Sequence, residues 1–371
     1  MSTAPAPTTT RRLDVAVIGG GHGAYATAAD LTEAGHRVRL WRRDASALQP
    51  LLESRTLTLL DHRGERAVAL AAVTADIGEA VSGAELVVVP LPATSQADVA
   101  AALAPHLSDG QVVFAPPGTL GSYLMAAAVD ARRPGLDVAW AEAGTLPYLA
   151  RKRGPAKVAV SARATRLPTG VFPSRRREHA LGVVGAAFPA IEPLVDVLDA
   201  ALVNAGPIIH PPLVVLNAAP IQHFDRWDIH NEGTQPAVRG VQDALDAERI
   251  AVREAIGYPA PHYPLRDHYA SDGDEWMYGR AAHEQVVDSA DWCEPLDLVH
   301  HRYVREDVFC GLALLASIGD WLGMRLAVAH GLLSVAGAFA GPEPDARTLG
   351  RLGLSQLSRD ELRHLLEEGL A

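Results

Sequence analysis

The chain has 371 residues, of which 48% are hydrophobic, and its 33 basic and 44 acidic side chains give a formal charge of −11. This length and apolar content predict two domains with packed cores, and the acidic balance argues against nucleic acid or an anionic membrane as the main partner. The two cysteines, Cys293 and Cys310, exclude a disulfide framework and suit a reducing, cytoplasmic compartment, with a single bridge as the open alternative.

Two segments resemble targeting or membrane signals without matching them. Residues 1–12, MSTAPAPTTTRR, contain no apolar run and predict a short disordered tail instead of a signal peptide. The apolar stretch 308–341 is interrupted by Asp320 and Arg325 within the length that a membrane span requires. This stretch therefore predicts a buried pair of helices.

Strand-like segments alternate with Ala- and Leu-rich segments from residue 13 to about residue 170. They are DVAVIG, RVRLW, ELVVVPL, QVVFAPP, DVAWAEA and KVAVSA. This alternation predicts an α/β fold whose N-terminal part is a Rossmann-type, doubly wound parallel sheet. We expect a dinucleotide-binding domain over residues 13–198, completed by the segment that begins at residue 183.

From His210 onward the strand-like segments end. Residues 234–257 carry Ala, Leu and Val at spacings of three and four, which predicts a long helix. Residues 358–361, SRDE, form a capping box, and Gly369 stands where the last helix would end. A mostly helical substrate and catalytic domain is therefore expected over residues 199–371.

The first strand-like segment runs into a glycine turn with the pattern G-x-G-x-x-A. Gly19 permits the tight turn, Gly21 lets the backbone approach a pyrophosphate, and Ala24 lets the next helix pack closely. His22 and Gly23 lie in the same turn, at the start of the helix. The pattern predicts a dinucleotide site at the positive end of that helix.

The second strand ends in Arg42 and Arg43, where an NAD site usually has a carboxylate for the ribose. Guanidinium groups at this position suit a 2′-phosphate by charge and by bidentate geometry. NADP(H) is therefore predicted as the preferred cofactor. NAD(H) remains the alternative, in which Asp44 reaches the ribose and both arginines face solvent.

Two further loops follow strands at the carboxyl edge of the sheet, where ligands bind in such folds. Pro90 lies in the first and is a cofactor-binding candidate, while Glu142 and Thr145 lie in the second and are substrate-binding candidates. A surface loop is an equal alternative for each. The basic stretches RKRGPAK, residues 151–157, and RRR, residues 175–177, predict solvated loops, with an anion contact as the alternative.

His210 is the catalytic candidate among the 15 histidines. It precedes Pro211 at the expected first turn of an apolar helix near the domain junction, and Asn204 and Asn217 flank it as candidate substrate-binding residues. Arg302 and Asp307 lie in a charged segment that opens another apolar helix. Asp307 would orient His210 and Arg302 would bind a carboxylate; an ordinary charged first turn is the alternative.

Six stretches together resemble the opine dehydrogenase family of the octopine/nopaline type, across nearly all of the chain after residue 12. They are the glycine turn, AEAGTLPYLAR, IIHPPLVVLNA, DALDAERIAVREAIG, HHRYVREDVFCGLALLASIG and RTLGRLGLSQLSRDEL. The resemblance implies reductive condensation of an α-keto acid with the amine of an amino acid, through reduction of an imine. It assigns the family's His/Asp pair to His210 and Asp307 and its carboxylate-binding arginine to Arg302. Arg42 and Arg43 depart from members that carry an acid there and use NAD(H).

Three alternatives stay open. A keto acid reductase similar to ketopantoate reductase or glycerol-3-phosphate dehydrogenase usually relies on a lysine, and Lys152 and Lys157, the two lysines here, both lie in the basic stretch. A catalytically silent NADP-binding regulator would keep the fold alone. HFDRWDIH, residues 223–230, and the histidine pair at 300–301 raise a metal site, but without an H-E-x-x-H motif none is expected. We expect small-molecule substrates as the partners and leave the oligomeric state open between a monomer and a homodimer.

Overall fold

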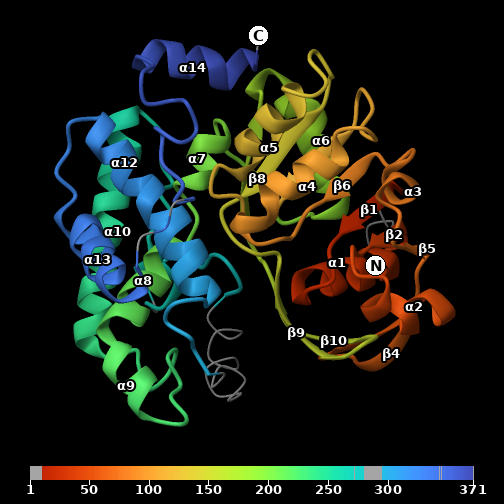
Figure 1. The fold of residues 1–371 in the computed structure, drawn as a ribbon, viewed down its shortest axis with the longest axis horizontal. Helices are drawn as coiled ribbons and strands as arrows, with labels where there is room; N and C mark the ends of the chain where they lie inside the picture. The colour runs from red at the N-terminus through yellow and green to blue at the C-terminus, as the bar shows by residue number, and fades with distance from the viewer. Residues whose placement is uncertain (1–10, 271, 280–294, 342, 344, 371) are drawn as a thin grey trace, which may run out of the picture.

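The computed structural model describes residues 11–270, 272–279, 295–341, 343 and 345–370 and contains two lobes (Figure 1). Strands and their helices form the N-terminal lobe, and helices form the second lobe. The first ten residues of the predicted tail, and Cys293, lie outside the described residues. The α/β class and the order of a sheet domain before a helical domain are confirmed, whereas the boundary after residue 198 stays a prediction.

A sheet of eight strands forms the centre of the N-terminal lobe. In spatial order its strands are β12 (Ile191–Pro193), β11 (Leu167–Phe172), β8 (Ala139–Ala143), β7 (Val112–Ala115), β6 (Leu86–Val88), β1 (Asp14–Ile18), β2 (Arg37–Trp41) and β5 (Ala72–Thr74). All neighbouring pairs are parallel except β11 and β8. Since β1 lies between β2 and β6, the chain reverses its direction across the sheet beside β1, where α/β folds bind dinucleotides.

Helices cover both faces of this sheet. Alternate residues of β1 point to opposite faces, so Val15 and Val17 belong to one core and Ala16 and Ile18 to the other. The first core includes α1 (His22–Glu33) and α6 (Arg177–Ala187), and the second includes α3 (Ile77–Val81), α4 (Gln96–Leu103) and α5 (Gly121–Asp130). The sheet is therefore doubly wound, as predicted.

A second, smaller sheet packs on α1. Its order is β4 (Gly64–Ala69), β3 (Thr56–Asp61), β10 (Lys157–Arg163) and β9 (Tyr148–Gly154), and a short segment with η1 (Ser46–Leu48) and α2 (Gln49–Ser54) leads into it. Two predictions are corrected here. KVAVSA forms β10 of this small sheet and not a strand of the parallel sheet, and RKRGPAK spans the β9–β10 hairpin and is not a solvated loop.

The second lobe contains helices, and no strand follows β12 in the described ranges. They are α8 (Gly206–Leu216), α9 (Ala218–His223), α10 (Pro236–Ile256), η4 (Leu265–His268), η5 (Tyr303–Leu312), α12 (Ala313–Trp321), α13 (Ala327–Ala340) and α14 (Arg359–Glu368). The short helix α7 (Val197–Ala201), which precedes them, packs on β11 and β8 of the large sheet. As predicted, α12 and α13 are paired helices and α10 is a single long helix. By length and composition alone, residues 197–216 could cross a membrane, but 83% of their apolar window is buried inside the fold, as in a core helix.

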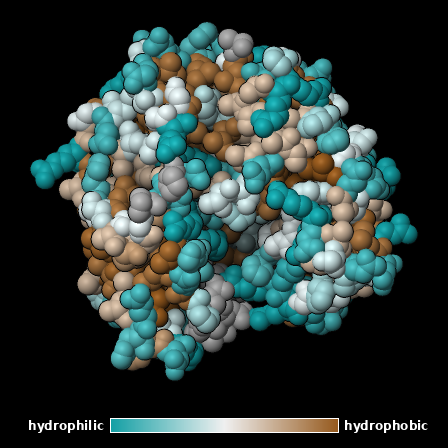
Figure 2. All heavy atoms as spheres, viewed as in Figure 1, coloured by the Kyte–Doolittle hydropathy of each residue, from teal (hydrophilic) through white to brown (hydrophobic). Residues whose placement is uncertain are grey.

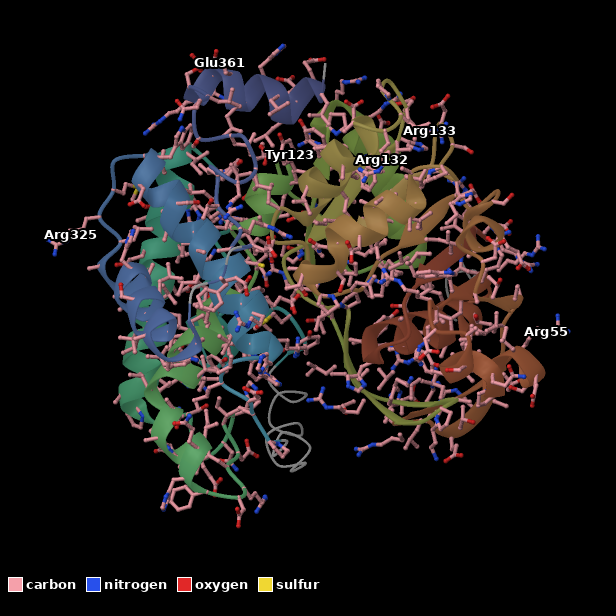
Figure 3. The ribbon with its side chains drawn as sticks, in the orientation of Figure 1. Arg55, Tyr123, Arg132, Arg133, Arg325 and Glu361 are labelled. Atoms are coloured by element: carbon pink, nitrogen blue, oxygen red, sulfur yellow. The ribbon has the colours of Figure 1, made fainter. Side chains whose placement is uncertain are left out.

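The C-terminal helix begins and ends as predicted. The Ser358 and Glu361 side chains cap the backbone reciprocally at the start of α14, and Gly369 is the C-cap residue. Figure 3 shows Glu361 at this end of the helix. The helix returns to the N-terminal lobe, where Arg175 Nε donates to Glu368 O at 2.7 Å.

Candidate active site

The predicted glycine turn joins β1 to α1 in a crowded bend. Gly19 has a φ of +135°, which favours glycine, and its N–H donates to Trp41 O at 2.8 Å. A Cβ built on Gly19 would lie 3.4 Å from the Cβ of Ala24, and one on Gly23 would lie 3.4 Å from the Cβ of Pro90. The turn and the loop after β6 therefore meet at one edge of the sheet.

The start of α1 has the features of a diphosphate site. Gly21 is the N-cap residue, and nothing lies within 4 Å of a Cβ built on it. In the described part of the chain no side chain caps this helix, and its first turn contains no acidic residue. The amides and the positive end of the helix dipole are thus available to a dinucleotide. His22 begins the helix, and its Nδ1 accepts a hydrogen bond from Lys152 N at 2.9 Å.

Arg42 lies against the glycine turn, and a Cβ built on Gly20 would collide with its side chain. Its guanidinium lies 3.9 Å from the Asp44 carboxylate. Asp44 accepts the backbone N–H of Ala47 at 3.1 Å, so this acid is engaged by its own loop. Arg43 is exposed. Among Arg42, Arg43 and Asp44, it is therefore the Arg42 side chain that lies across the turn, where the ribose end of the cofactor would bind.

The sequence prediction missed Lys152 as a neighbour of this turn. Its Nζ donates to Gly20 O at 3.0 Å. The sequence indicated an anion contact only as the alternative for the basic stretch that contains this lysine. The pairing of β9 with β10, and of β10 with β3, is what brings the lysine to α1.

His210 and Asp307 meet, although 97 residues separate them. Nδ1 of His210 lies 2.7 Å from Oδ2 of Asp307, and the two side chains are 14% and 9% exposed. Pro211 led to the prediction that His210 lies in the first turn of its helix, and this position is corrected. Because α8 begins at Gly206, Pro207 occupies the first turn and His210 lies one turn further on.

Two glycines allow the crossing of α8 with η5 that joins the pair. A Cβ on Gly206 would collide with Oδ1 of Asp307, and a Cβ on Gly311 would collide with Pro207. The segment η5 is π-helical, a form that recurs at functional sites. The close approach of the two helix backbones therefore places the Asp307 carboxylate at Nδ1 of the imidazole.

Aromatic side chains fix the plane of the imidazole. Tyr303 stacks on His210 with ring centroids 3.8 Å apart and an interplanar angle of 13°. His230 meets the His210 ring edge-on, and its Nε2 lies 3.1 Å from Tyr303 OH. With Nδ1 directed at Asp307, the second nitrogen, Nε2, is the atom of His210 available to a substrate.

Burial governs the titration of the pair. Burial and the Arg302 charge lower the pKa of His210 well below its usual range. Burial raises the pKa of Asp307 to about 7, against the opposing effect of Arg302. A carboxyl that keeps a proton near neutral pH beside an imidazole is a proton store for acid–base chemistry.

Arg302 is exposed and lies close enough to influence the pKa of both members of the pair. Its guanidinium carbon lies 5.0 Å from the centroid of the Tyr303 ring. Tyr278 is another neighbour, and its OH donates to Leu146 O at 2.9 Å and lies 3.5 Å from Oγ1 of Thr145. Thr145, from the N-terminal lobe, and Arg302 are thus on the same side of the site. Figure 2 shows the surface hollowed between the lobes.

The two asparagines predicted to bind substrate have other hydrogen-bond partners. Asn204 Nδ2 donates to Thr119 Oγ1 at 2.7 Å, and its Oδ1 accepts Gly206 N at 3.0 Å. Asn217 caps the far end of α8, where Nδ2 donates to Leu213 O and Gly233 O. These contacts indicate that both asparagines stabilise the ends of α8.

Glu142 is fully buried and does not line an open surface. Its carboxylate accepts the N–H of Leu120 at 2.7 Å and the N–H of Ser122 at 3.0 Å, at the start of α5. Burial raises its pKa to about 7 despite these donors. The loop before α5 encloses this side chain, and a substrate contact of Glu142 stays a prediction.

Two family models match separate parts of the chain. The model for the alpha-helical domain of NAD/NADP octopine/nopaline dehydrogenase matches residues 193–340, and that for the N-terminus of NAD-dependent glycerol-3-phosphate dehydrogenase matches residues 14–116. An opine dehydrogenase from Arthrobacter sp. (strain 1C) is 27% identical over 360 residues, which cover 95% of this chain and 98% of that protein. The chain is therefore similar to opine dehydrogenases over nearly its whole length.

Solved structures share the fold of this chain. Octopine dehydrogenase in complex with NADH and agmatine has a TM-score of 0.72 at 17% identity and covers 97% of this chain and 99% of its own. Yersinopine dehydrogenase with NADP⁺ bound has a TM-score of 0.63 at 17% identity, with 96% and 98% covered. The protein is an NAD(P)-dependent oxidoreductase that acts on CH–NH groups.

Two side chains of the helical lobe, the buried Arg347 and the half-buried Glu306, hold the N-terminal lobe. Arg347 donates to Thr119 O at 2.9 Å and to Ala93 O at 3.1 Å. Glu306 accepts the N–H of Ala93 at 3.1 Å. Both contacts join the two lobes close to Asp307, so they fix the distance across the site.

Proposed function

We propose that this opine dehydrogenase uses NADPH and condenses an α-keto acid with the amine of an amino acid, giving a secondary-amine dicarboxylate. The observation that carries the proposal is the hydrogen bond of 2.7 Å between Nδ1 of His210 and Oδ2 of Asp307, with Arg302 beside the pair. The glycine turn that would hold the cofactor is in the N-terminal lobe, and the pair is in the helical lobe. The reacting carbon would therefore lie between the lobes.

Residues of the N-terminal lobe hold the cofactor in this proposal. The amides of Gly21 and His22 would bind its pyrophosphate, and Arg42 would bind its 2′-phosphate. The bound nicotinamide supplies the hydride that reduces the imine carbon. Pro90, which lies against Gly23, would border the cofactor at the carboxyl edge of the sheet.

His210 acts as the proton carrier. Nε2 of the protonated pair would donate a proton to the keto oxygen while the free amine of the amino acid attacks the keto carbon. It would then pass a proton from the attacking nitrogen to the hydroxyl, which leaves as water. Asp307, hydrogen-bonded at Nδ1, keeps the ring oriented and stabilises its charged form. Tyr303 holds the ring plane during both transfers.

Arg302 binds the keto acid carboxylate. A guanidinium that is exposed and close to His210 can form two parallel hydrogen bonds with a carboxylate. This contact would place the keto carbon in a fixed direction from the imidazole, and such positioning is a large part of a rate enhancement. Thr145 and Tyr278 lie on the same side and would border this substrate.

The test follows NADPH and NADH oxidation by nicotinamide absorbance with a keto acid alone, an amino acid alone, and both. We expect oxidation only with both substrates, and a higher kcat/KM with NADPH. Oxidation with a keto acid alone would instead assign a simple keto acid reductase. Equal or better use of NADH would contradict the cofactor preference and leave the condensation intact.

A further inference from the structure

Lys152 of β9 is held over the glycine turn by three contacts. Its Nζ donates to Gly20 O at 3.0 Å and lies 3.8 Å from the centroid of the Tyr25 ring. Its backbone N–H donates to Nδ1 of His22 at 2.9 Å. Lys152 is therefore held against the start of α1 by both its ammonium group and its backbone N–H.

The small sheet determines this position. β9 pairs antiparallel with β10, in which Lys152 is opposite Val158, and β10 pairs with β3. Arg163 of β10 donates to the carboxylates of Asp30, on α1, and Asp61, at 2.6 and 2.8 Å. The hairpin is thus tied to α1 by ion pairs, so the lysine is not a side chain of a free surface loop.

Two cations converge on Gly20. The Arg42 side chain fills the space beside its Cα, and Lys152 binds its carbonyl. Burial and the charge of Arg42 lower the pKa of Lys152, which shows that the two charges repel. Asp44 lies 3.9 Å from Arg42 and is mostly exposed, so it offsets little of this repulsion. An anion between the two cations would be favourable.

We propose that Lys152 determines cofactor specificity by binding the 2′-phosphate of NADPH together with Arg42, an inference that rests on the proposed NADPH dependence. An ammonium group has three N–H donors, and Gly20 O uses one of them. Gly20 follows β1 and lies beside the end of β2, which is where a Rossmann fold holds the adenosine ribose. Two cations from separate sheets then enclose the phosphate.

The test compares 2′,5′-ADP with 5′-ADP, which differ only in the 2′-phosphate, by isothermal titration calorimetry. For Lys152→Gln we expect the Kd of 2′,5′-ADP to rise by about 10- to 100-fold, in the range of a charge-assisted hydrogen bond. The Kd of 5′-ADP should stay within about 2-fold, since that ligand lacks the group which the lysine binds.

Two variants serve as controls. Lys157→Gln removes the other lysine of the hairpin, whose Nζ pairs with Glu65, and should change neither Kd. Lys152→Arg keeps the charge and should retain the preference for 2′,5′-ADP to within about 3-fold, which separates loss of charge from a folding defect.

The outcomes separate this inference from the proposed function. Equal weakening of both ligands by Lys152→Gln would assign the lysine to the pyrophosphate, and unchanged binding would remove it from the site; either overturns the inference while wild-type preference for 2′,5′-ADP stands. If the wild-type protein binds 5′-ADP as tightly as 2′,5′-ADP, the proposed NADPH dependence is wrong, and so is the role of Lys152 in binding the 2′-phosphate.

Discussion

Asp307 Oδ2 lies 2.7 Å from Nδ1 of His210, and both side chains are almost enclosed by the fold. The contact forms because glycines at the crossing of α8 and η5 let the two helices approach closely. It directs Nε2 of the imidazole away from the carboxylate, as a proton carrier requires. The chemistry of the site depends on this pair.

The first prediction concerns pH. Since the pKa of Asp307 is raised to about 7, the proton shared with His210 is present below pH 7 and lost above it. Reductive condensation takes up a proton, so its kcat should be level below pH 7 and fall about 10-fold per pH unit above it. Oxidation of the product should show the opposite slope. A flat reductive profile from pH 6 to pH 9 would contradict this assignment.

The second prediction removes the carboxylate. Asp307→Asn should lower kcat by about 100- to 10,000-fold and abolish the pH-dependent fall near pH 7, with little change in NADPH affinity. Asp320→Asn, on α12, is the matched control, since Asp320 is exposed and pairs with His330. A normal kcat for Asp307→Asn would exclude Asp307 from proton transfer.

The third prediction concerns substrate binding. Arg302→Gln should raise the KM of the keto acid by about 10- to 100-fold, because a charge-assisted, bidentate contact is lost. Arg302→Lys keeps the charge without the planar fork and should give an intermediate KM. Steady-state kinetics with both substrates varied would measure this. An unaltered KM in Arg302→Gln would refute the carboxylate contact.

The fourth prediction separates structure from catalysis at Glu142. Glu142→Gln should lower the free energy of unfolding by about 2 kcal/mol and leave KM unchanged, because an amide nitrogen replaces one of the two buried oxygens that accept from Leu120 and Ser122. The folded pKa of Glu142 is raised to about 7, so its stabilisation is present below the unfolded value and lost as the pH rises through 7. The stability difference should thus narrow from pH 5 to pH 8.

Urea unfolding at both pH values would measure this difference, with Glu178→Gln, an exposed acid on α6, as control. A changed KM at unchanged stability would return Glu142 to the substrate site.

The fifth prediction tests the joint between the lobes. Arg347 is buried and donates to Thr119 O and Ala93 O. Arg347→Met should therefore lower the free energy of unfolding by about 3 kcal/mol and speed amide hydrogen exchange in the loops that contain Ala93 and Thr119. Arg351→Met removes an exposed guanidinium four residues away and should cost little. Exchange measured by mass spectrometry would contradict the joint if the Ala93 and Thr119 loops were unchanged.

Local patterns predicted the parts of the fold that depend on short-range physics. The strands around the glycine turn, the long helix α10 and the capping box at Ser358 all follow from periodicity and turn chemistry within a few residues. The small sheet did not follow, because β10 pairs with β3 about 100 residues away. Its short apolar strand is equally compatible with either sheet, and long-range pairing decides between them.

The same distinction holds for the site. His210 and Asp307 were selected by residue type and by family resemblance, and only the crossing of two helices brings them together. Asn204 and Asn217 were selected by nearness to His210 in the sequence, and Glu142 by its place after a strand. Each is engaged by backbone or side-chain partners that sequence spacing does not reveal. Lys152 was missed because strand pairing, not proximity in the chain, places it at Gly20.

The most direct test of the central claim is the fate of the transferred hydride. The protein would be given NADPH carrying deuterium at the reactive C4 position, an α-keto acid and an amino acid, and the product would be identified by mass spectrometry. We predict a secondary-amine dicarboxylate with one deuterium on the carbon derived from the keto group, and none formed by His210→Ala. Deuterium in a 2-hydroxy acid, with the amino acid unchanged, would contradict reduction of an imine.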